Sequence, residues 1–267
     1  MFIDTHCHLN MMIKNVIETF LNDQEFKFIK NILDQANLVG VKKFITIGTT
    51  VLESINSVNI AKKFSQVFAS VGIHPCDCSV DFLKNFEQIK KLIKNKEENK
   101  IVAIGETGLD FFHKPFDKQK QIDAFKAHIE LACQNNLPII VHVRNSAQEV
   151  LEILEKYKKD VRGVIHCFFQ DKNFAQTALS WGFYLGISGP INYPKNQELR
   201  DVVIDLPIDK ILLETDAPFL PPQEFRGKQN NPAYIPIFAK VIADLKNVTL
   251  SELEKITTQN AENLFKI

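Results

Sequence analysis

The chain has 267 residues, 45% of them hydrophobic, with only 10 Gly and 11 Pro, which excludes a disordered chain and predicts a substantial core. Lys plus Arg and Asp plus Glu each number 32, so the net charge is zero and no overall field draws the protein to nucleic acid or to a membrane. Any anionic substrate must therefore be held by local contacts.

Strand-like and helix-like segments alternate along the chain. Short apolar runs predict strands at 2–8, 43–48, 67–74, 101–106, 138–142, 163–167, 183–188 and 211–216. Apolar residues at helical spacing predict helices at 23–39, 51–64, 81–98, 117–134, 146–157, 173–181 and 196–203, with further helix in the tail from 234 to 265. The strand runs are nearly all apolar rather than alternating, as is typical of parallel strands buried on both faces.

This pattern favours one α/β fold, a TIM (β/α)8 barrel, forming a single domain over residues 1–267. There is no linker or composition break to mark a second domain, and α/β barrels commonly run to about 250 residues. The structural alternative is an open doubly wound sheet, which should carry a Gly-rich phosphate turn after an early strand, and the sequence has none.

Metal-suited side chains stand where the predicted strands end. In a barrel these ends share one face, and active sites lie there. The residues at strand ends are His6, His8, His74, Glu106, His142, His166 and Asp216. Any one of them has an ordinary structural explanation, but the set does not. Two histidines, His113 and His128, fall outside the pattern.

The set predicts a metal centre of two ions rather than one. Imidazole and carboxylate suit Zn, Mn or Fe, and carboxylate-rich sites also accept Mg. Even six ligands from this set are too many for one tetrahedral ion, whereas two ions about 3.5–4 Å apart can share a bridging carboxylate. Glu106, on a middle strand, is the expected bridge. Asp216 is expected to bind metal and to accept a proton from the attacking water.

Motifs spread over the chain resemble those of TatD-type metal-dependent deoxyribonucleases of the amidohydrolase superfamily. They are FIDTHCHLN, VGIHP, IGETGLDF, LPIIVHVR, VIHCF, ILLETDAPFLPP and RGKQNNPAY. The resemblance implies a TIM barrel, two divalent ions (Zn, Mg or Mn), and hydrolysis of DNA, commonly from a 3′ end of single strands.

Position by position, the family's metal ligands match His6, His8, Glu106, His142, His166 and Asp216. The resemblance places His74 near the substrate phosphate, and the residue types in the segment after the last strand suggest further phosphate contacts or braces at Arg226, Lys228, Asn231 and Tyr234. The sequence departs from the family at Val143, Asn145, Phe169 and Gln170, which bears on the fit of the substrate.

We therefore expect a nuclease in which water activated by the ions attacks a phosphodiester, Asp216 takes the proton, and His74 assists the phosphate. Phe111, Phe112 or Phe169, near the mouth of the site, would stack on bases, although core or rim packing is the simpler role for each. The alternative is an esterase, lactonase or deacylase that uses the same centre, and a binding protein with a vestigial site is a second rival.

Cysteine usage and the absence of membrane signals set the expected environment. Five scattered cysteines do not form a disulfide framework, and Cys76-x-Cys78 has no second pair at zinc-finger spacing, so incidental thiols are favoured there. By strand alternation, Cys7 should face away from the metal. With no signal-peptide pattern and no run near the roughly 20 apolar residues of a membrane span, we expect a cytoplasmic protein with DNA as its partner and no obligate protein partner.

Overall fold

The computed structural model describes residues 1–13, 19–78 and 81–267. Within these residues the strands form one eight-stranded parallel sheet in which each strand pairs with the next along the chain. The strands are β1 (Phe2–Cys7), β2 (Val41–Ile47), β3 (Val67–Val71), β4 (Ile101–Asp110), β5 (Ile139–Arg144), β6 (Gly163–Ile165), β7 (Tyr184–Ile187) and β8 (Ile211–Leu213). The predicted barrel is confirmed.

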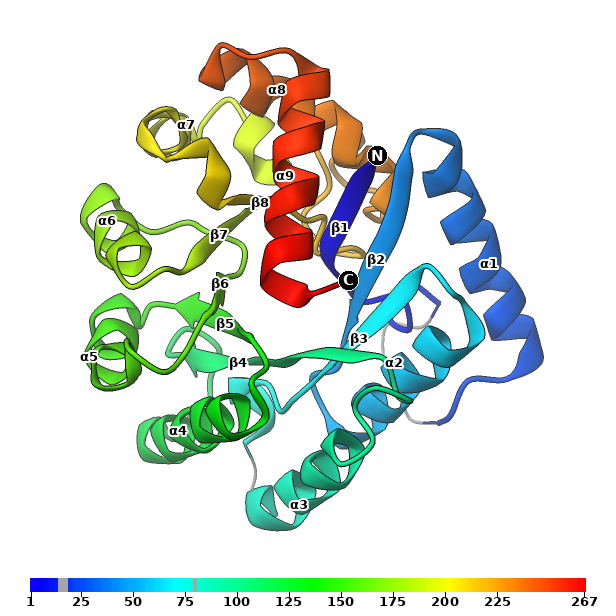
Figure 1. Ribbon diagram of the computed structural model, residues 1–267, viewed down its shortest axis with the longest axis vertical. Coiled ribbons are helices and arrows are strands. Elements are labelled where there is room, and N and C mark those ends of the chain that lie inside the picture. Colours follow the sequence, from blue (N-terminus) through cyan, green and yellow to red (C-terminus); the bar gives the residue numbers. More distant parts are fainter. Residues whose placement is uncertain (14–18, 79–80) are drawn as a thin grey trace.

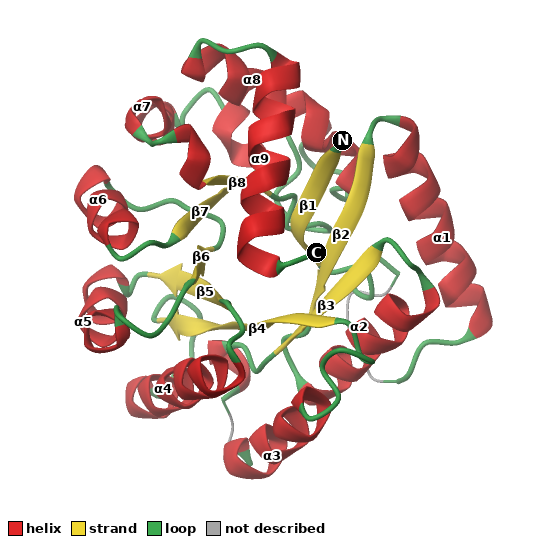
Figure 2. Ribbon diagram, viewed as in Figure 1, coloured by secondary structure: helices red, strands yellow, loops and turns green. Residues whose placement is uncertain are grey.

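Helices surround the strands, as Figures 1 and 2 show. They are α1 (Asp23–Leu38), α2 (Val51–Lys63), α3 (Phe82–Ile93), α4 (Lys118–Asn135), α5 (Ala147–Tyr157), α6 (Lys172–Ser180), α7 (Gln197–Asp205), α8 (Ile235–Lys246) and α9 (Leu250–Phe265). Among the described residues, no helix combines the length and apolar character needed to span a membrane.

Capping residues fix where several helices begin and end. Asn22 caps α1 through a capping box with Glu25, and Thr249 caps α9 in the same way. Asn247 takes a left-handed conformation after α8, which ends that helix and divides the predicted tail into α8 and α9. The tail is therefore two helices, and the second begins at Leu250, where residues 250–253 predict a helix start.

The core has two layers, and one end of the barrel is sealed. The larger layer packs the outward side chains of the strands against the helices. The smaller layer fills the barrel interior with residues such as Ile3, Ile45 and Leu212, and it includes Leu264 and Phe265 of α9. In Figure 1 α9 lies across this end of the barrel. Access to the interior is consequently left to the opposite end, where the strands finish.

The barrel closes at the carboxyl ends of β1 and β8. The backbone N–H of Asp216 donates to the carbonyl of His6 at 2.8 Å, and that of His8 donates to Ala217 at 2.7 Å. Two residues earlier on β1, the carboxylate of Asp4 accepts from the hydroxyl of Thr215 at 2.6 Å and from the backbone N–H of Thr215 at 3.0 Å. Closure therefore fixes Asp216 beside the first two histidines.

The observed strand ends differ from the predicted ones in a way that matters for the site. β4 does not stop at Glu106, because its next four residues continue to pair with β5 as far as Asp110 and Arg144. β3 ends at Val71, so His74 lies beyond the strand as the cap of the short 3-10 helix η1 (Pro75–Asp77). β6 and β8 likewise end just before His166 and the Glu214–Asp216 segment.

Candidate metal centre

His6 and His8 form the base of the site, at the end of β1. Their side chains leave the same side of the strand, and their Nε2 atoms are 3.2 Å apart. The ring of His6 stacks on that of His166, with 3.6 Å between ring centroids. Cys7 faces the other way into the core layer between strands and helices, with its thiol near the carbonyl of Ile45, as alternation predicts.

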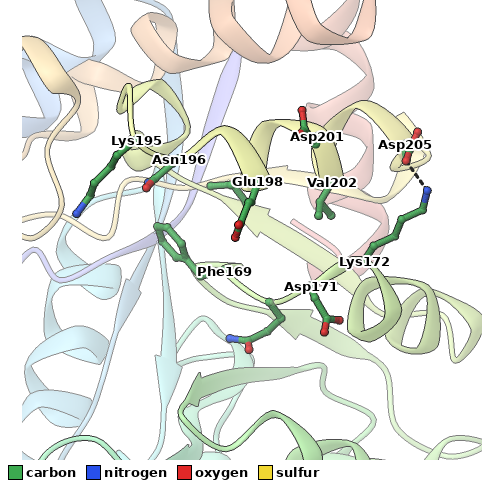
Figure 3. A pocket seen from close by; sticks show the side chains of 11 residues that line it. Phe169, Asp171, Lys172, Lys195, Asn196, Glu198, Asp201, Val202 and Asp205 are labelled. Atoms are coloured by element: carbon green, nitrogen blue, oxygen red, sulfur yellow. Dashed lines mark hydrogen bonds and ion pairs between the residues drawn. The ribbon is translucent and has the colours of Figure 1, made fainter.

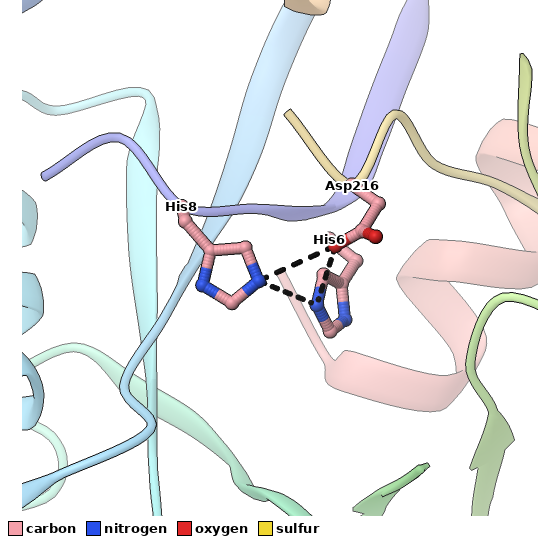
Figure 4. A group of neighbouring side chains, drawn as sticks. All are labelled: His6, His8 and Asp216. Atoms are coloured by element: carbon pink, nitrogen blue, oxygen red, sulfur yellow. Dashed lines mark hydrogen bonds and ion pairs between the residues drawn. The ribbon is translucent and has the colours of Figure 1, made fainter. Parts of the chain in front are cut away.

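Asp216 completes the first cluster of donors. Its Oδ1 lies 3.3 Å from Nε2 of His8 and 3.5 Å from Nε2 of His6. Figure 4 shows the three side chains directed toward one another from the ends of β1 and β8. Three donor atoms thus converge on one point, as the ligands of a single ion do.

Glu106 faces two clusters with its two oxygens. Oε2 lies 3.4 Å from Nε2 of His6 and 3.8 Å from Nε2 of His8. Oε1 lies 2.9 Å from Nδ1 of His142 and 3.6 Å from Nε2 of His166. A carboxylate with one oxygen toward each of two donor groups is placed as a bridging ligand would be.

Two further carboxylates stand behind the histidines, and neither was singled out from the sequence. Glu214 Oε1 accepts from Nδ1 of His166 at 2.9 Å and from the backbone N–H of Cys167 at 2.6 Å. Asp110 Oδ2 lies 3.1 Å from Nε2 of His142. Even spacing along a strand was the available signal, since Asp110 follows Glu106 by four residues and Glu214 precedes Asp216 by two.

In this buried site the negative carboxylates and the positive histidines stabilise one another's charged forms. Burial opposes ionisation of Glu106, but the charge of His166 and hydrogen bonds from His142 and His6 outweigh it, so its pKa lies well below the usual range. Burial lowers the pKa of His166, yet Glu214 and Glu106 together raise it to about 10. Opposite charges on Glu106 and His166 thus stabilise one another within the site.

The chemistry of the donors fits divalent ions. Among the described residues, groups of three donor atoms within 4.8 Å of one another include His6 with His8 and Asp216, and His6 with Glu106 and His166. Nδ1 of His6 and Nδ1 of His8 are buried and have no hydrogen-bond partner among the residues that the structure describes. Carboxylates and imidazoles packed this closely repel unless protons or cations lie between them. The residues present suit such a cation.

His74 lies beside these donors but is held differently. Its Nδ1 accepts the backbone N–H of Cys76 at 3.2 Å, which leaves the proton on Nε2, 3.6 Å from Glu106 Oε1. Burial, followed by the charge of His142, lowers its pKa to about 3, so the ring is neutral. An imidazole whose Nε2 carries the proton offers a donor to an anion rather than a lone pair to a metal.

Four residues of the segment after β8 do not line either of the two cavities, of about 360 and 400 Å³, that open over the candidate metal centre. Arg226 stacks over the ring of Tyr193 at 4.9 Å, and Tyr234 stacks on Phe225 at 4.0 Å. The Lys228 ammonium lies 5.9 Å from the same Phe225 ring. Asn231 caps the 3-10 helix η5 (Pro232–Tyr234) by accepting from the N–H of Ala233. Their described contacts brace this loop, and a role at a phosphate stays a prediction.

Of the two histidines outside the strand-end pattern, His128 is structural. It is fully buried on α4, where Nε2 accepts the N–H of Ile73 at 3.1 Å and Nδ1 donates to the carbonyl of Ala124 at 2.7 Å. Burial lowers its pKa to about 4. His113 instead lines the cavities over the metal centre.

Two adjoining cavities open over the centre. One of about 360 Å³ is lined by His8, His74, Glu106 and other donors, and one of about 400 Å³ by His142, His166 and Phe169. Exposed aromatic rings, Phe219 at 49% and Phe169 at 41%, stand at their edges. The ring of Phe219 meets that of His8 edge to face, with 5.8 Å between centroids.

A further hollow, of about 690 Å³, lies between α6 and α7 and shares Phe169 and Gln170 with the cavity over the centre. Figure 3 shows Asp171, Glu198, Asp201 and Asp205 around it, with an ion pair between Lys172 and Asp205. Its charged lining has four carboxylates against the two ammonium groups of Lys172 and Lys195, so the lining carries a net negative charge. A phosphate backbone is repelled by such a surface, so this hollow is poorly suited to a nucleic-acid strand.

Comparison with known proteins gives matches over the whole chain. The family model described as TatD related DNase matches residues 3–266. The chain is 34% identical to the uncharacterized metal-dependent hydrolase YabD of Bacillus subtilis strain 168, over 100% of both chains. It is also 34% identical to the uncharacterized metal-dependent hydrolase YcfH of Escherichia coli strain K12, over 99% of this chain and 96% of the relative. The crystal structure of the TatD homolog YjjV from Escherichia coli K12 superposes with a TM-score of 0.89 at 27% identity, covering 100% of this chain and 98% of that one.

Proposed function

The chain belongs to the family of TatD-related DNases, and from this premise we propose that it hydrolyses phosphodiester bonds of DNA, acting from 3′ ends of single strands. At the coarser level it is a metal-dependent hydrolase, the description that its curated relatives carry. Two divalent ions, Zn, Mg or Mn, are the proposed cofactors.

The observation that carries the proposal is the position of Glu106 between two donor groups. His6, His8 and Asp216 would hold one ion, and His142 and His166 the other, with one oxygen of Glu106 toward each. When bound, a pair of divalent ions polarises the phosphoryl oxygens and lowers the pKa of water, which is the chemistry needed to break a phosphodiester at neutral pH.

Asp216 is the proposed proton acceptor. The hydrogen bond from His8 and the charges of His166 and His6 hold its pKa below the usual value, against the effect of burial. An ionised carboxylate is ready to take a proton from the attacking water. It keeps this position because the barrel closes through its own backbone N–H.

His74 is the proposed phosphate contact. Its ring is neutral and presents Nε2–H beside Glu106, and it lines the same cavity as the metal ligands. A neutral donor stabilises a phosphate oxygen without competing for the cation. The Phe219 and Phe169 rings at the cavity edges suit stacking of one or two bases, which binds single strands without sequence preference.

The test is a digestion of end-labelled oligonucleotides by protein stripped of metal and then reloaded separately with Zn, Mg or Mn. Release of single nucleotides from 3′ ends of single-stranded DNA, dependent on added metal, is the expected result. An Asp216→Asn preparation, purified in parallel, controls for a contaminating nuclease. A lactone and an aryl ester are assayed beside the DNA, and hydrolysis of these with the DNA left intact would replace the proposal with the acyl-hydrolase alternative.

A further inference from the structure

His113 and Asp110 form a hydrogen-bonded pair at the mouth of the site. Asp110 is the last residue of β4 and is fully buried, whereas the side chain of His113, three residues later, is 63% exposed. His113 lines both cavities over the centre. A histidine that the strand-end pattern left out therefore reaches the substrate side of the site.

The pair is held in one geometry by the backbone. Asp110 Oδ1 accepts the N–H groups of Phe112 and His113, each at 2.9 Å, while Oδ2 lies 2.8 Å from Nδ1 of His113. The ring of Phe112 packs edge to face against His113, and the guanidinium of Arg144 stacks on Phe112 at 4.8 Å. Because two backbone N–H groups donate to Oδ1 and the imidazole faces Oδ2, the carboxylate of Asp110 is the acceptor and the proton between the two side chains lies on Nδ1 of His113. Nε2 is then the nitrogen available to a substrate.

His113 is not placed as a metal ligand. Within the residues that the structure describes, none of the groups of three donor atoms at metal-binding spacing contains it. What the pair resembles instead is the arrangement in which a buried carboxylate orients an imidazole, so that the second nitrogen can pass a proton to the reacting group.

We propose that His113 is the general acid for the leaving group of the hydrolysis, an inference that rests on the proposed function. The oxygen of water forms its bond to phosphorus and gives a proton to Asp216. The bond from phosphorus to the leaving oxygen breaks, its electron pair stays on that oxygen, and Nε2 of His113 supplies the proton. Solvent exchange then returns the proton from Asp216 to His113. The substrate class this serves is esters of alkyl alcohols such as a sugar hydroxyl, whose alkoxides leave poorly without a proton.

Leaving-group dependence tests this role. The variant His113→Gln is compared with the wild-type protein on a thymidine dinucleotide, which has an alkyl leaving group, and on thymidine p-nitrophenyl phosphate, whose phenolate leaves without protonation. The dinucleotide should lose about 10²-fold or more in kcat/KM, as removal of general-acid catalysis typically costs. The nitrophenyl ester should be nearly unaffected. Lys114→Gln, an exposed change at the next residue, is the matched control and should leave both rates intact.

Metal content provides a readout apart from activity. His113→Gln should retain the metal stoichiometry of the wild-type protein, and a loss of metal would make His113 a ligand and overturn the proposal. Equal slowing of both substrates, or of neither, would also overturn it. Asp110→Asn should slow both esters, since Asp110 also contacts His142. If the wild-type protein cleaves no phosphodiester, the proposed function fails by itself, and the same comparison with an alkyl and an aryl carboxylic ester then decides the role of His113.

Discussion

Replacing Glu214 by Gln is expected to weaken metal binding while the barrel stays folded. Glu214 is 1% exposed, and a single oxygen accepts both the Nδ1–H of His166 and the N–H of Cys167. Its other oxygen has no hydrogen-bond partner within the described part of the chain and faces Gly186, where an added Cβ would lie 2.2 Å from it. The glycine thus provides the space in which this carboxylate is held against the back of His166.

The magnitude follows from what Gln can and cannot replace. Its amide oxygen can accept the same two hydrogen bonds but carries no charge, and its NH₂ group would stand beside Gly186 where the second carboxylate oxygen had no partner. The bond to His166 then changes from charge-assisted to neutral, a difference of about 1 kcal/mol or more. Loss of a carboxylate behind a metal-binding histidine typically costs about 10- to 100-fold in affinity, or roughly 1.4–2.8 kcal/mol.

The assay is a titration of metal-free protein with Zn²⁺ in competition with a chromophoric chelator, alongside thermal unfolding to verify the fold. Gly186→Ala, which should displace the carboxylate without removing its charge, is expected to weaken binding in the same direction. Glu198→Gln, an exposed acid in the hollow between α6 and α7, is the matched control and should bind as the wild-type protein does. If folded Glu214→Gln protein bound metal with unchanged affinity, Glu214 would have no part in setting the ligand strength of His166.

Three further results are expected. Asp216→Asn should lose most turnover, by about 10²-fold or more, with an unchanged circular dichroism spectrum; full hydrolysis would remove Asp216 from the mechanism. His128 has a folded pKa of about 4 against 6.5 unfolded, so its stabilising contribution is complete above pH 6.5 and declines as the pH falls toward 4. Between pH 6.5 and 4 the unfolding free energy of the wild-type protein, measured with denaturant, should therefore fall by about 3 kcal/mol more than that of His128→Gln. An equal fall in both proteins would contradict the burial argument. Gly108→Ala should lower the unfolding free energy by about 2 kcal/mol or more, because φ is +141° and the new Cβ would lie 2.1 Å from the His142 carbonyl. Gly227→Ala, at φ +82° in open space, is its control and should cost only about 1 kcal/mol.

The strand ends show how far the sequence could go. Apolar runs buried on both faces predicted eight parallel strands, and from those ends alone His6, His8, Glu106 and the other candidate ligands could be assigned to one face. The structure brings those residues together.

The strand-end pattern does not select the residues that act behind and beside the candidate ligands, and even spacing along a strand only points to Asp110 and Glu214 without placing them. Asp110 enters the site because β4 keeps pairing with β5 after Glu106, and this pairing depends on a neighbouring strand rather than on local sequence. Glu214 enters because Gly186 on the adjacent strand leaves room for its carboxylate. His113 is brought to the cavities by its hydrogen bond to Asp110, three residues before it.

Sequence by itself determined the family, the order of strands and helices, and the chemical types that meet at the open end of the barrel, because periodicity and strand direction are local properties of the chain. Tertiary structure alone decided which oxygen of Glu106 faces which histidine, which carboxylates orient His142 and His166, and how closure of β8 onto β1 holds Asp216 beside His6. These depend on the register between strands far apart in sequence, and register is set only when the barrel closes.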